Sequence, residues 1–543
     1  MTPSIFSPFV SFMGHPRPDP ARPEGGADGG PAPGAAPRRA AMLVAFLALL
    51  AWSFIFTGSR GIWEPDEGRY TAIALEMLRS GDFLIPAVHP EQPHVAKPPV
   101  TYWAIAGSIA LFGHNEWAAR LPNALAFALT GLLLFHLGRR VVPAQPWMPT
   151  LVYSVSLLPF VGAAFITSDT LLGLGETAGM ACYVAALHES RPRRRTWWIA
   201  GLWLAFAFAF LIKGPPALLP LVAIVVLHVA SPRCHDLPRL LSPVGFLCFA
   251  APIAAWSVAI EHRLPGLLGH LLHYEVFGRV ATSIHDRNAS GWDAFRVYVP
   301  TLLLGVLPWT VAGLGALRAA PRWLHVSTWR LAATRDSSAV LLAAWFCGPL
   351  AVFLAVRSRL PLYVLPLFVP LSLMLARSLA SRQILASRRW RAALAVWMTL
   401  LVGIKATAGH VAARDDTRDY ARYLASIAKA PVAEVVFVDM RPRYGLSLYL
   451  GVQVESLALQ PNTPRADGFG VKETVAEELA SNEAHRLFVL PNRLGRAFHV
   501  ECERAGAIVT CVGMRGEDSI YAELPHARAV RQSPPSEQVK PAS

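Results

Sequence analysis

Residues 41–70 read AMLVAFLALLAWSFIFTGSRGIWEPDEGRY, an apolar run of membrane-spanning length followed directly by a dense group of charges. Three carboxylates and one arginine lie within the last eight residues of this stretch. Ionisable groups beside the hydrocarbon of a bilayer are costly and usually have a function. Pro65 favours a helix that begins there, and such a helix places Asp66, Arg69 and Tyr70 on one face. That face would carry a carboxylate base, a guanidinium that binds phosphate and an aromatic wall.

The composition of the whole chain is that of a membrane protein. The 543 residues are 53% hydrophobic and 16% charged, with a mean hydropathy of +0.38, which argues against a soluble multidomain protein. The net charge of +14 would also fit nucleic-acid binding. However, the arginines fall between apolar runs and form no single stripe, which indicates loops that orient a membrane protein. We therefore expect no nucleic-acid partner.

Apolar runs of about 20 residues predict about 11 to 13 membrane spans together with interfacial helices. The clearest candidates are residues 41–58, 117–138, 147–167, 170–188, 196–212, 216–231, 240–260, 293–317, 339–356, 360–377 and 391–410. Arginines such as Arg139 and Arg140 cluster at alternate ends of these runs, and the positive-inside rule makes those ends cytoplasmic. We predict an α-helical polytopic protein whose residues 1–40 form a disordered cytoplasmic N-terminus and whose transmembrane domain covers residues 41–410.

The other polar clusters all fall at the opposite, external ends of the predicted spans. The loop of residues 59–116 contains the acidic motif, Lys97 and a short apolar stretch that we expect to lie along the interface. Further clusters follow at residues 167–169, 213–216, 261–292 and 357–363. Loops without a function would not gather their charges on one side, so the active surface is predicted to be external.

The character of the chain changes after the last predicted span. Short strands are predicted near residues 435–438, 487–490 and 507–511, with helices near 443–450 and 475–481, which indicates a small α/β domain. We assign this external domain to residues 411–525 and a disordered tail to residues 526–543. The domain contains Cys502 and Cys511, which form a disulfide or remain free thiols with equal expectation.

The external groups fit the transfer of a sugar from a polyprenyl phosphate. Such a reaction needs a carboxylate that takes a proton from the acceptor and cations that hold the departing phosphate. Asp66 is the best candidate base and Asp169 is the second. The candidate phosphate ligands are Arg69, Lys97, Lys213, Arg279 and Arg359, and the candidate pocket residues are Glu67, Tyr70 and Tyr363.

Each of these residues also has a simpler structural interpretation. Asp66 or Asp169 would serve equally as a helix cap, and the lysines as anchors at the bilayer surface. Arg359 would equally bind lipid headgroups. A metal site built from His270, His273 and Glu275 is a low-probability alternative, because interfacial histidines usually only form hydrogen bonds.

Several motifs resemble the bacterial polyprenyl-phosphate-sugar-dependent glycosyltransferases of the GT-C class, which are similar to lipid A aminoarabinose transferases and protein O-mannosyltransferases. The matching segments are EPDEGRY (64–70), EMLRSGDF (76–83), KPP (97–99), FGHNEWAARLP (112–122), LIKG (211–214) and SRLPLYVLP (358–366). The resemblance covers about residues 41–410 and implies a GT-C fold with a C-terminal periplasmic domain. It also implies an active site facing the periplasm and an inverting transfer from an undecaprenyl-phosphate sugar.

The resemblance further assigns roles to individual residues. It makes Asp66 the catalytic aspartate and Asp169 the second acidic residue of the site. It gives the donor phosphate to Arg69, Lys97 and Lys213, and it places Arg279 at the basic position of the second external loop and Tyr363 in the pocket wall. Two metal ligands of the aminoarabinose transferases are replaced by Ala96 and Val276, so the same metal site is not expected unless His94, His270 or His273 substitutes. No cofactor is therefore predicted with certainty.

These observations lead to three hypotheses, the first of which has two possible acceptors. The principal hypothesis is an inner-membrane glycosyltransferase that modifies lipid A of lipopolysaccharide or another envelope acceptor, with protein as an alternative acceptor. The second hypothesis is a transporter or flippase of lipid-linked sugars, which should show charges or broken helices at mid-membrane and an internal repeat. The third is an envelope scaffold that binds partners through its C-terminal domain. Neither the sugar nor the acceptor follows from the sequence.

Overall fold

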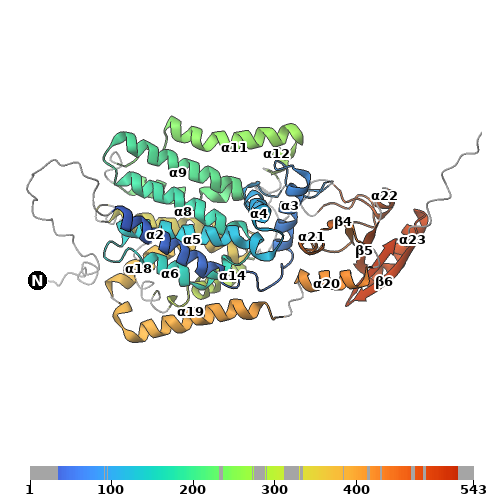
Figure 1. Cartoon of the computed structure of the whole chain (residues 1–543). Coiled ribbons are helices and arrows are strands. Elements are labelled where there is room, and N and C mark those ends of the chain that lie inside the picture. Colours follow the sequence, from blue (N-terminus) through green and yellow to red (C-terminus); the bar gives the residue numbers. More distant parts are fainter. Residues whose placement is uncertain are drawn as a thin grey trace, which may run out of the picture.

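A computed structural model of the chain shows a helical body followed by a C-terminal sheet (Figure 1). The structure describes residues 35–90, 92–94, 96–231, 237–271, 273, 288, 290–310, 313, 329, 334, 336–382, 384–411, 416–428, 431–465, 471–480 and 485–523. The two predicted disordered ends lie almost entirely outside these residues. Glu275, Val276 and Arg279 lie outside them as well.

Within the described residues, seven helical segments are long and apolar enough to cross a membrane. These are α5 (Glu116–Val141), α8 (Ser168–Leu187), α9 (Pro192–Lys213), α11 (Pro243–Arg263), α17 (Ser337–Ala355), the continuous pair η5 (Pro361–Leu367) and α18 (Phe368–Ser381), and α19 (Arg388–Ala408). The other predicted spans have a shorter apolar part, which for α2 is Ala40–Phe54, or are short or interrupted helices. These are α2 (Ala35–Phe54), α6 (Met148–Val155) with α7 (Leu157–Gly162), η1 (Pro215–Leu218) with α10 (Leu221–Ala230), and α14 (Gly291–Gly305). The stretch predicted to be interfacial is the short helix α4 (Val100–Phe112).

Small residues allow the central helices to approach one another closely. A methyl group at Gly175 of α8 would lie 2.8 Å from Cβ of Ala209 on α9, and one at Gly179 would lie 3.1 Å from the Phe206 ring. Small residues at contacts between spans serve this purpose in membranes, where lipid tails are as apolar as leucine. The antiparallel pair α8 and α9 thereby brings the start of one helix beside the end of the other.

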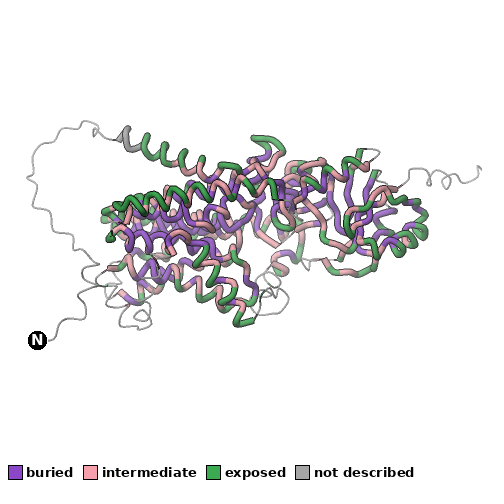
Figure 2. The backbone as a smooth tube through the Cα atoms, turned by 90° about the horizontal axis from the view of Figure 1, so that it is seen from below, coloured by how far each residue is buried: buried purple, intermediate pink, exposed green. Residues whose placement is uncertain are grey.

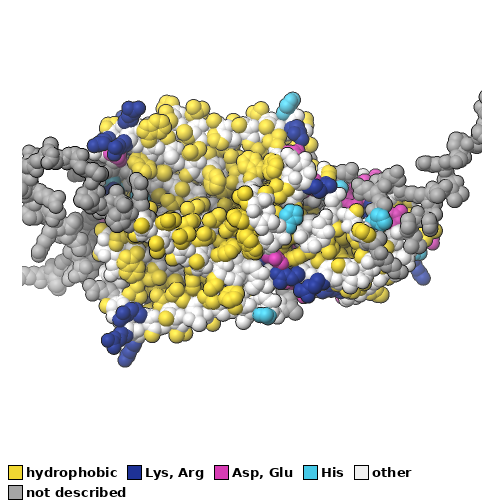
Figure 3. Space-filling view, viewed as in Figure 1, with side chains coloured by type: hydrophobic (Ala, Val, Ile, Leu, Met, Phe, Trp, Pro, Cys, Tyr) yellow, Lys and Arg dark blue, Asp and Glu magenta, His cyan; other side chains and the backbone are white. Residues whose placement is uncertain are grey.

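The outer helices present apolar side chains away from the protein. Only 11% of the apolar window of α11, and the same share for α19, is buried, against 72% for α8. Figure 2 shows this contrast between exposed outer surfaces and the buried interior. In Figure 3 hydrophobic side chains cover the helical body, and Lys and Arg gather at its end opposite to the sheet, where α9 and α19 begin. This distribution agrees with lipid around the body and basic groups at one surface.

The C-terminal region contains a five-stranded mixed sheet with the order β4-β3-β5-β7-β6. The strands are β3 (Glu434–Val438), β4 (Gln453–Leu457), β5 (Arg486–Pro491), β6 (Val509–Arg515) and β7 (Asp518–Glu523). The helices are α20 (Thr417–Ile427), α21 (Leu446–Leu450), α22 (Val475–Ala480) and α23 (Gly495–Arg504). The pairs β3–β4 and β3–β5 are parallel, whereas β7 is antiparallel to both of its neighbours. Cys502 and Cys511 are free thiols.

The C-terminal region packs against the loop that follows α2. That loop contains α3 (Asp66–Ser80) and a two-stranded hairpin, β1 (Ala87–His89) and β2 (Gln92–Pro93). One buried apolar cluster joins Ile62 and side chains of α3 and α4 to Leu448 of α21. The two regions therefore share a core.

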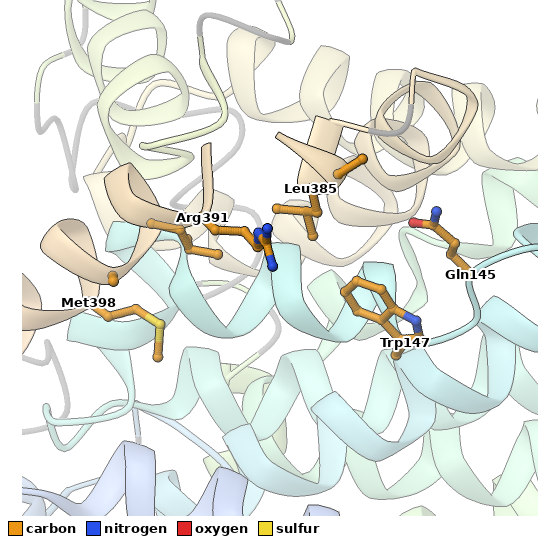
Figure 4. A pocket seen from close by; sticks show the side chains of 8 residues that line it. Gln145, Trp147, Leu385, Arg391 and Met398 are labelled. Carbon is orange, nitrogen blue, oxygen red and sulfur yellow. The ribbon is translucent and has the colours of Figure 1, made fainter. Parts of the chain in front are cut away.

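A separate groove opens at the other end of the helical body. It has a volume of about 540 Å³ and lies between the start of α19 and the turn from α5 to α6 (Figure 4). Its lining is Gln145, Trp147, Leu385, Ala386, Arg391, Leu394, Ala395 and Met398. α5 ends and α19 begins beside this groove, whereas Glu116 at the start of α5 pairs with Arg418 of the C-terminal region. The groove therefore lies at the far end of the body and plays no part in the site below.

Candidate active site

The predicted helix start at Pro65 is confirmed. Pro65 is the N-cap of α3, and Gly81, with φ +72°, ends the helix in the left-handed conformation that glycine adopts without strain. Asp66 in the first turn forms an ion pair with Arg69 at 2.5 Å. Its side chain is 63% exposed and that of Arg69 is 29% exposed. The Asp66 carboxylate is therefore accessible from solvent.

One turn further along α3, Tyr70 connects the helix to Lys97 and Ser168. Tyr70 is buried, its hydroxyl is hydrogen-bonded to Lys97 Nζ, and Lys97 Nζ also lies 3.4 Å from Ser168 Oγ. Burial alone would lower the pKa of Lys97, but the Tyr70 oxygen and the Asp169 carboxylate outweigh it and raise that pKa. Lys97 is thus a cation near neutral pH, held beside the second acidic residue.

Asp169 lies in the first turn of α8 and is held by two groups. The Thr167 hydroxyl donates to Asp169 Oδ2 at 2.8 Å, and Lys213 at the end of α9 forms an ion pair with Oδ1. The Lys213 ammonium also lies 4.4 Å from the centre of the Tyr363 ring in η5. The structure therefore brings Asp169, Lys213 and Tyr363 together from three separate elements.

Three cations and two carboxylates lie close together where the loop after α2 meets the start of α8 and the end of α9. They are Arg69, Lys97, Lys213, Asp66 and Asp169. Arg69 and Lys97 also surround His94, and burial together with these two charges lowers the pKa of His94 well below its ordinary value. The imidazole is neutral near pH 7, so the local charge comes from the arginine, the lysines and the two aspartates. Such a set of fixed cations suits an anionic phosphate.

Glu67, predicted as a pocket residue, lies in the protein interior between two arginines. Its oxygens accept hydrogen bonds from Arg60 at 2.5 and 2.8 Å and from Arg120 at 2.8 and 3.1 Å. Burial would raise the pKa of Glu67, but the two guanidinium groups lower it to about 2. The Ile166 N–H donates to the same carboxylate at 3.0 Å. Glu67 thereby ties the external loop to α5 and to the segment before α8.

Arg359 is held by backbone carbonyls and not by a carboxylate of this cluster. The guanidinium of Arg359 donates to the carbonyls of Asn288, Ser290 and Leu354 at 2.7 to 3.0 Å. It therefore holds residues 288 and 290, just before α14. His270 ends the short helix α12 (Leu267–His270) and His273 is exposed. Glu275 and Arg279, the remaining predictions in that loop, lie outside the described residues.

Sequence reasoning missed Arg60, Arg120 and Ser168. Arg120 is fully buried near the start of α5, inside a predicted apolar run, and an arginine in such a run was the signal for a buried ion pair. Arg60 carried a weaker signal, because an arginine after a span is ordinarily an anchor. Ser168 had none beyond its position next to Asp169.

One group of acidic side chains among the described residues has the spacing of a metal site. It consists of Glu434, Glu455 and Glu478 in the C-terminal region. Arg486 Nε lies 2.8 Å from Glu478 and 3.4 Å from Glu434, so a guanidinium already neutralises part of this charge. Ala96 in the loop after α2 offers no ligand atom. The absence of the family metal site therefore stays a prediction.

Sequence comparison finds glycosyltransferases that are similar to part of the chain. The family model for dolichyl-phosphate-mannose-protein mannosyltransferases matches residues 96–256. The undecaprenyl phosphate-alpha-4-amino-4-deoxy-L-arabinose arabinosyl transferase 2 of Sodalis glossinidius is 31% identical over 343 residues, 62% of this chain and 58% of that protein. The arabinosyl transferase of Yersinia pestis is 30% identical over 337 residues, 61% of this chain and 58% of that protein. The chain thus matches less than two thirds of the length of these relatives.

Structural comparison extends the similarity to nearly the whole chain. The crystal structure of ArnT from Cupriavidus metallidurans bound to undecaprenyl phosphate matches with a TM-score of 0.69 at 19% identity, covering 91% of this chain and 99% of that one. The same protein in the apo state gives a TM-score of 0.66 and covers 89% and 98%. At this identity the match establishes the fold. The predicted resemblance and the predicted GT-C membrane fold with a C-terminal sheet are confirmed.

Proposed function

We propose that the chain is a membrane glycosyltransferase that moves a sugar from a polyprenyl-phosphate donor to an acceptor of the cell envelope. One observation carries the proposal, namely an exposed carboxylate, Asp66, at the edge of a cluster that contains Arg69, Lys97 and Lys213. The names of the similar arabinosyl transferases specify a sugar on undecaprenyl phosphate, which is the donor class that such a cluster suits.

In the proposed reaction Asp66 removes the proton from an acceptor hydroxyl as that oxygen attacks the anomeric carbon. The bond between this carbon and the phosphate oxygen breaks, and the polyprenyl phosphate leaves with the electron pair. Arg69, Lys97 and Lys213 stabilise the negative charge that develops on the phosphate, and attack from the opposite face inverts the anomeric centre. Asp169 holds Lys213 and acts as the second acidic residue of the site.

The position of the cluster at one end of the helical body supports a membrane-surface reaction. The predicted cytoplasmic arginines gather at the other end (Figure 3), so we assign the cluster to the periplasmic face of the inner membrane. A donor phosphate at headgroup height would reach it without leaving the bilayer. This placement favours transfer over a transport pathway, because in the described residues the charged cluster lies at helix ends.

The acceptor is proposed to be lipid A or another envelope glycan or lipid. Protein is the second candidate, favoured by the family model over residues 96–256, whose description names protein as the acceptor. Mass spectrometry of lipid A and of envelope proteins from a deletion strain separates the two. Loss of a sugar from lipid A supports the first, and loss of a glycan from protein supports the second.

The test of the mechanism is Asp66→Asn in purified protein reconstituted with a polyprenyl-phosphate sugar. We expect transfer to fall by about 10²- to 10⁴-fold, as for loss of a positioned base. The matched control is Asp82→Asn, because Asp82 lies in the same loop and pairs with Arg263 at 2.8 Å while 29% of its side chain is exposed. This control should stay within a few-fold of wild type. Equal activity of the two variants would remove Asp66 from the mechanism.

A further inference from the structure

The turn before α3 contains a carboxylate that the proposed reaction does not use. Glu64 lies two residues before Asp66, and its Oε1 accepts hydrogen bonds from the Gly445 N–H at 2.7 Å and from the Thr417 hydroxyl at 3.1 Å. Its other oxygen is buried and has no hydrogen-bond partner among the described residues. A carboxylate in this position connects the turn of Asp66 to the C-terminal region.

The fit around this carboxylate depends on two glycines. A methyl group at Gly68 of α3 would collide with the Glu64 carboxylate. A methyl group at Gly445 would lie 3.1 Å from both Glu64 Oε1 and Thr417 Oγ1. The close approach of the Glu64 carboxylate to α3 and to the segment before α21 therefore requires a residue without a side chain at each position.

Backbone contacts hold the same turn from the same direction. The Thr417 N–H donates to the Ile62 carbonyl at 3.0 Å, and the Ile62 N–H donates to the Tyr449 hydroxyl at 2.8 Å. Trp63 forms an isolated β-bridge with Asp416. The residues before Asp66 are thus bound to the start of α20 and to α21, both in the C-terminal region.

We propose that Glu64 is a positioning residue through which the C-terminal domain holds the turn that carries Asp66. The proposal rests on the proposed function, because it gives Asp66 a reaction in which its place matters. Asp66 itself is exposed and its one described side-chain partner is Arg69, so its location depends on the backbone of the turn. A misplacement of about 1 Å in such a group costs on the order of 10²-fold in rate. The C-terminal domain is then part of the catalytic machinery.

The charge of Glu64 makes this coupling depend on pH. Burial raises the pKa of Glu64 from 4.5 to about 7, and its hydrogen bonds only partly oppose this rise. The charged groups that face it are Arg69 on α3 and Arg443 before α21, and both favour the carboxylate. Asp416 at the start of α20 is the nearby acid and accepts from the Gly61 N–H at 3.3 Å. The folded pKa lies above the ordinary value, so the protonated form of Glu64 stabilises the contact between the turn and the C-terminal region. This stabilisation is largest in acid and is lost as the pH rises through about 7.

The experiment measures kcat and the donor KM of the full-length reconstituted protein between about pH 5.5 and 8.5. Glu64→Ala should lower kcat by about 10- to 100-fold and leave the donor KM within about threefold. Glu64→Gln keeps an acceptor oxygen and should retain most of kcat at pH 7 while losing the wild-type pH step near 7. Thr417→Val should give a smaller fall in kcat. The control is Asp82→Asn, which breaks the 2.8 Å pair with Arg263 in the same loop, and it should behave as wild type.

A second readout separates this inference from the proposed function. Amide hydrogen exchange of residues 61–70 should be at least about 10-fold faster in Glu64→Ala than in wild type and unchanged in Asp82→Asn, whether or not transfer is detected. Wild-type exchange, kcat and pH profile in Glu64→Ala would overturn the positioning role. If Glu64→Ala does not fold, Glu64→Gln with an unchanged pH profile together with Thr417→Val with wild-type kcat would overturn it equally.

Discussion

Replacing Glu67 with glutamine should destabilise the protein by removing the one negative charge between two buried guanidinium groups. Both Arg60 and Arg120 are at most 6% exposed at the side chain, and each donates twice to the Glu67 carboxylate. Removing one partner of a buried ion pair costs about 3–5 kcal/mol. The fall in the pKa of Glu67 from 4.5 to about 2 corresponds independently to about 3 kcal/mol in favour of the charged form. We therefore expect about 3 kcal/mol for Glu67→Gln.

The assay is thermal unfolding of detergent-solubilised protein, followed by tryptophan fluorescence. An unfolding entropy of about 2 cal/mol/K per residue gives about 1 kcal/mol per degree for a chain of 543 residues. The apparent Tm should therefore fall by about 3 °C. Glu501→Gln is the control. The side chains of Glu501 and its partner Arg504 are 30% and 71% exposed, so their ion pair should contribute less than about 1 kcal/mol.

The pH dependence of this difference has a definite sign. The folded pKa of Glu67 is depressed, so its contribution is complete above the ordinary value of 4.5 and is lost as the pH falls towards about 2. The Tm gap between wild type and Glu67→Gln should therefore narrow between about pH 5 and pH 3. A Tm for Glu67→Gln equal to that of Glu501→Gln at pH 7 would refute the assigned role of Glu67.

Three further predictions concern the site and its surroundings. Lys213→Met leaves Asp169 without its ion-pair partner and removes one phosphate cation, so transfer should fall by about 10²-fold or more in steady-state assays; an unchanged rate would exclude Lys213 from the site. Arg359→Ala removes the donors to the carbonyl of Asn288, so limited proteolysis near that residue should become faster while untreated protein keeps its fold; an unchanged cleavage rate would contradict the clamping role. Chelation with EDTA should change transfer by less than about twofold because Ala96 provides no ligand; a loss that zinc restores would show that other side chains bind a metal.

The helix that carries Asp66 could be predicted because its signals are local. Pro65 marks its start, and the spacing of Asp66, Arg69 and Tyr70 follows from helical geometry alone. Spans were recognised for the same reason, since an apolar run of sufficient length needs no partner to be identified. Where these signals were interrupted, as at Ser156 between α6 and α7, the predicted span is a broken helix.

The pairing of charged residues could not be predicted, because it depends on how distant elements pack. Lys213 meets Asp169 only because α8 and α9 are antiparallel and closely packed, and 44 residues separate the pair. Glu67 meets Arg120 across 53 residues. A sequence predicts that both groups lie on one side of the membrane, but it does not predict which cation each carboxylate pairs with.

The C-terminal sheet was predicted only in part for a related reason. Strands β3 and β5 are nearly continuous apolar runs that the sequence predicts, although β3 also begins with the buried Glu434. Strand β4 reads QVESL and β7 reads DSIYAE, so their polar residues concealed them. In β4 the glutamate at position 455 is buried and accepts from Gln92 at 2.6 Å, a contact that only the folded junction explains.

The most direct test of the proposed function follows the donor itself. Purified protein in liposomes is supplied with an undecaprenyl-phosphate sugar and an envelope lipid extract, and the lipids are analysed by mass spectrometry. The proposal predicts that free undecaprenyl phosphate and a sugar-modified acceptor appear together in equal amounts. Movement of the intact donor between leaflets, with no bond broken and no acceptor modified, would contradict it and identify a transporter.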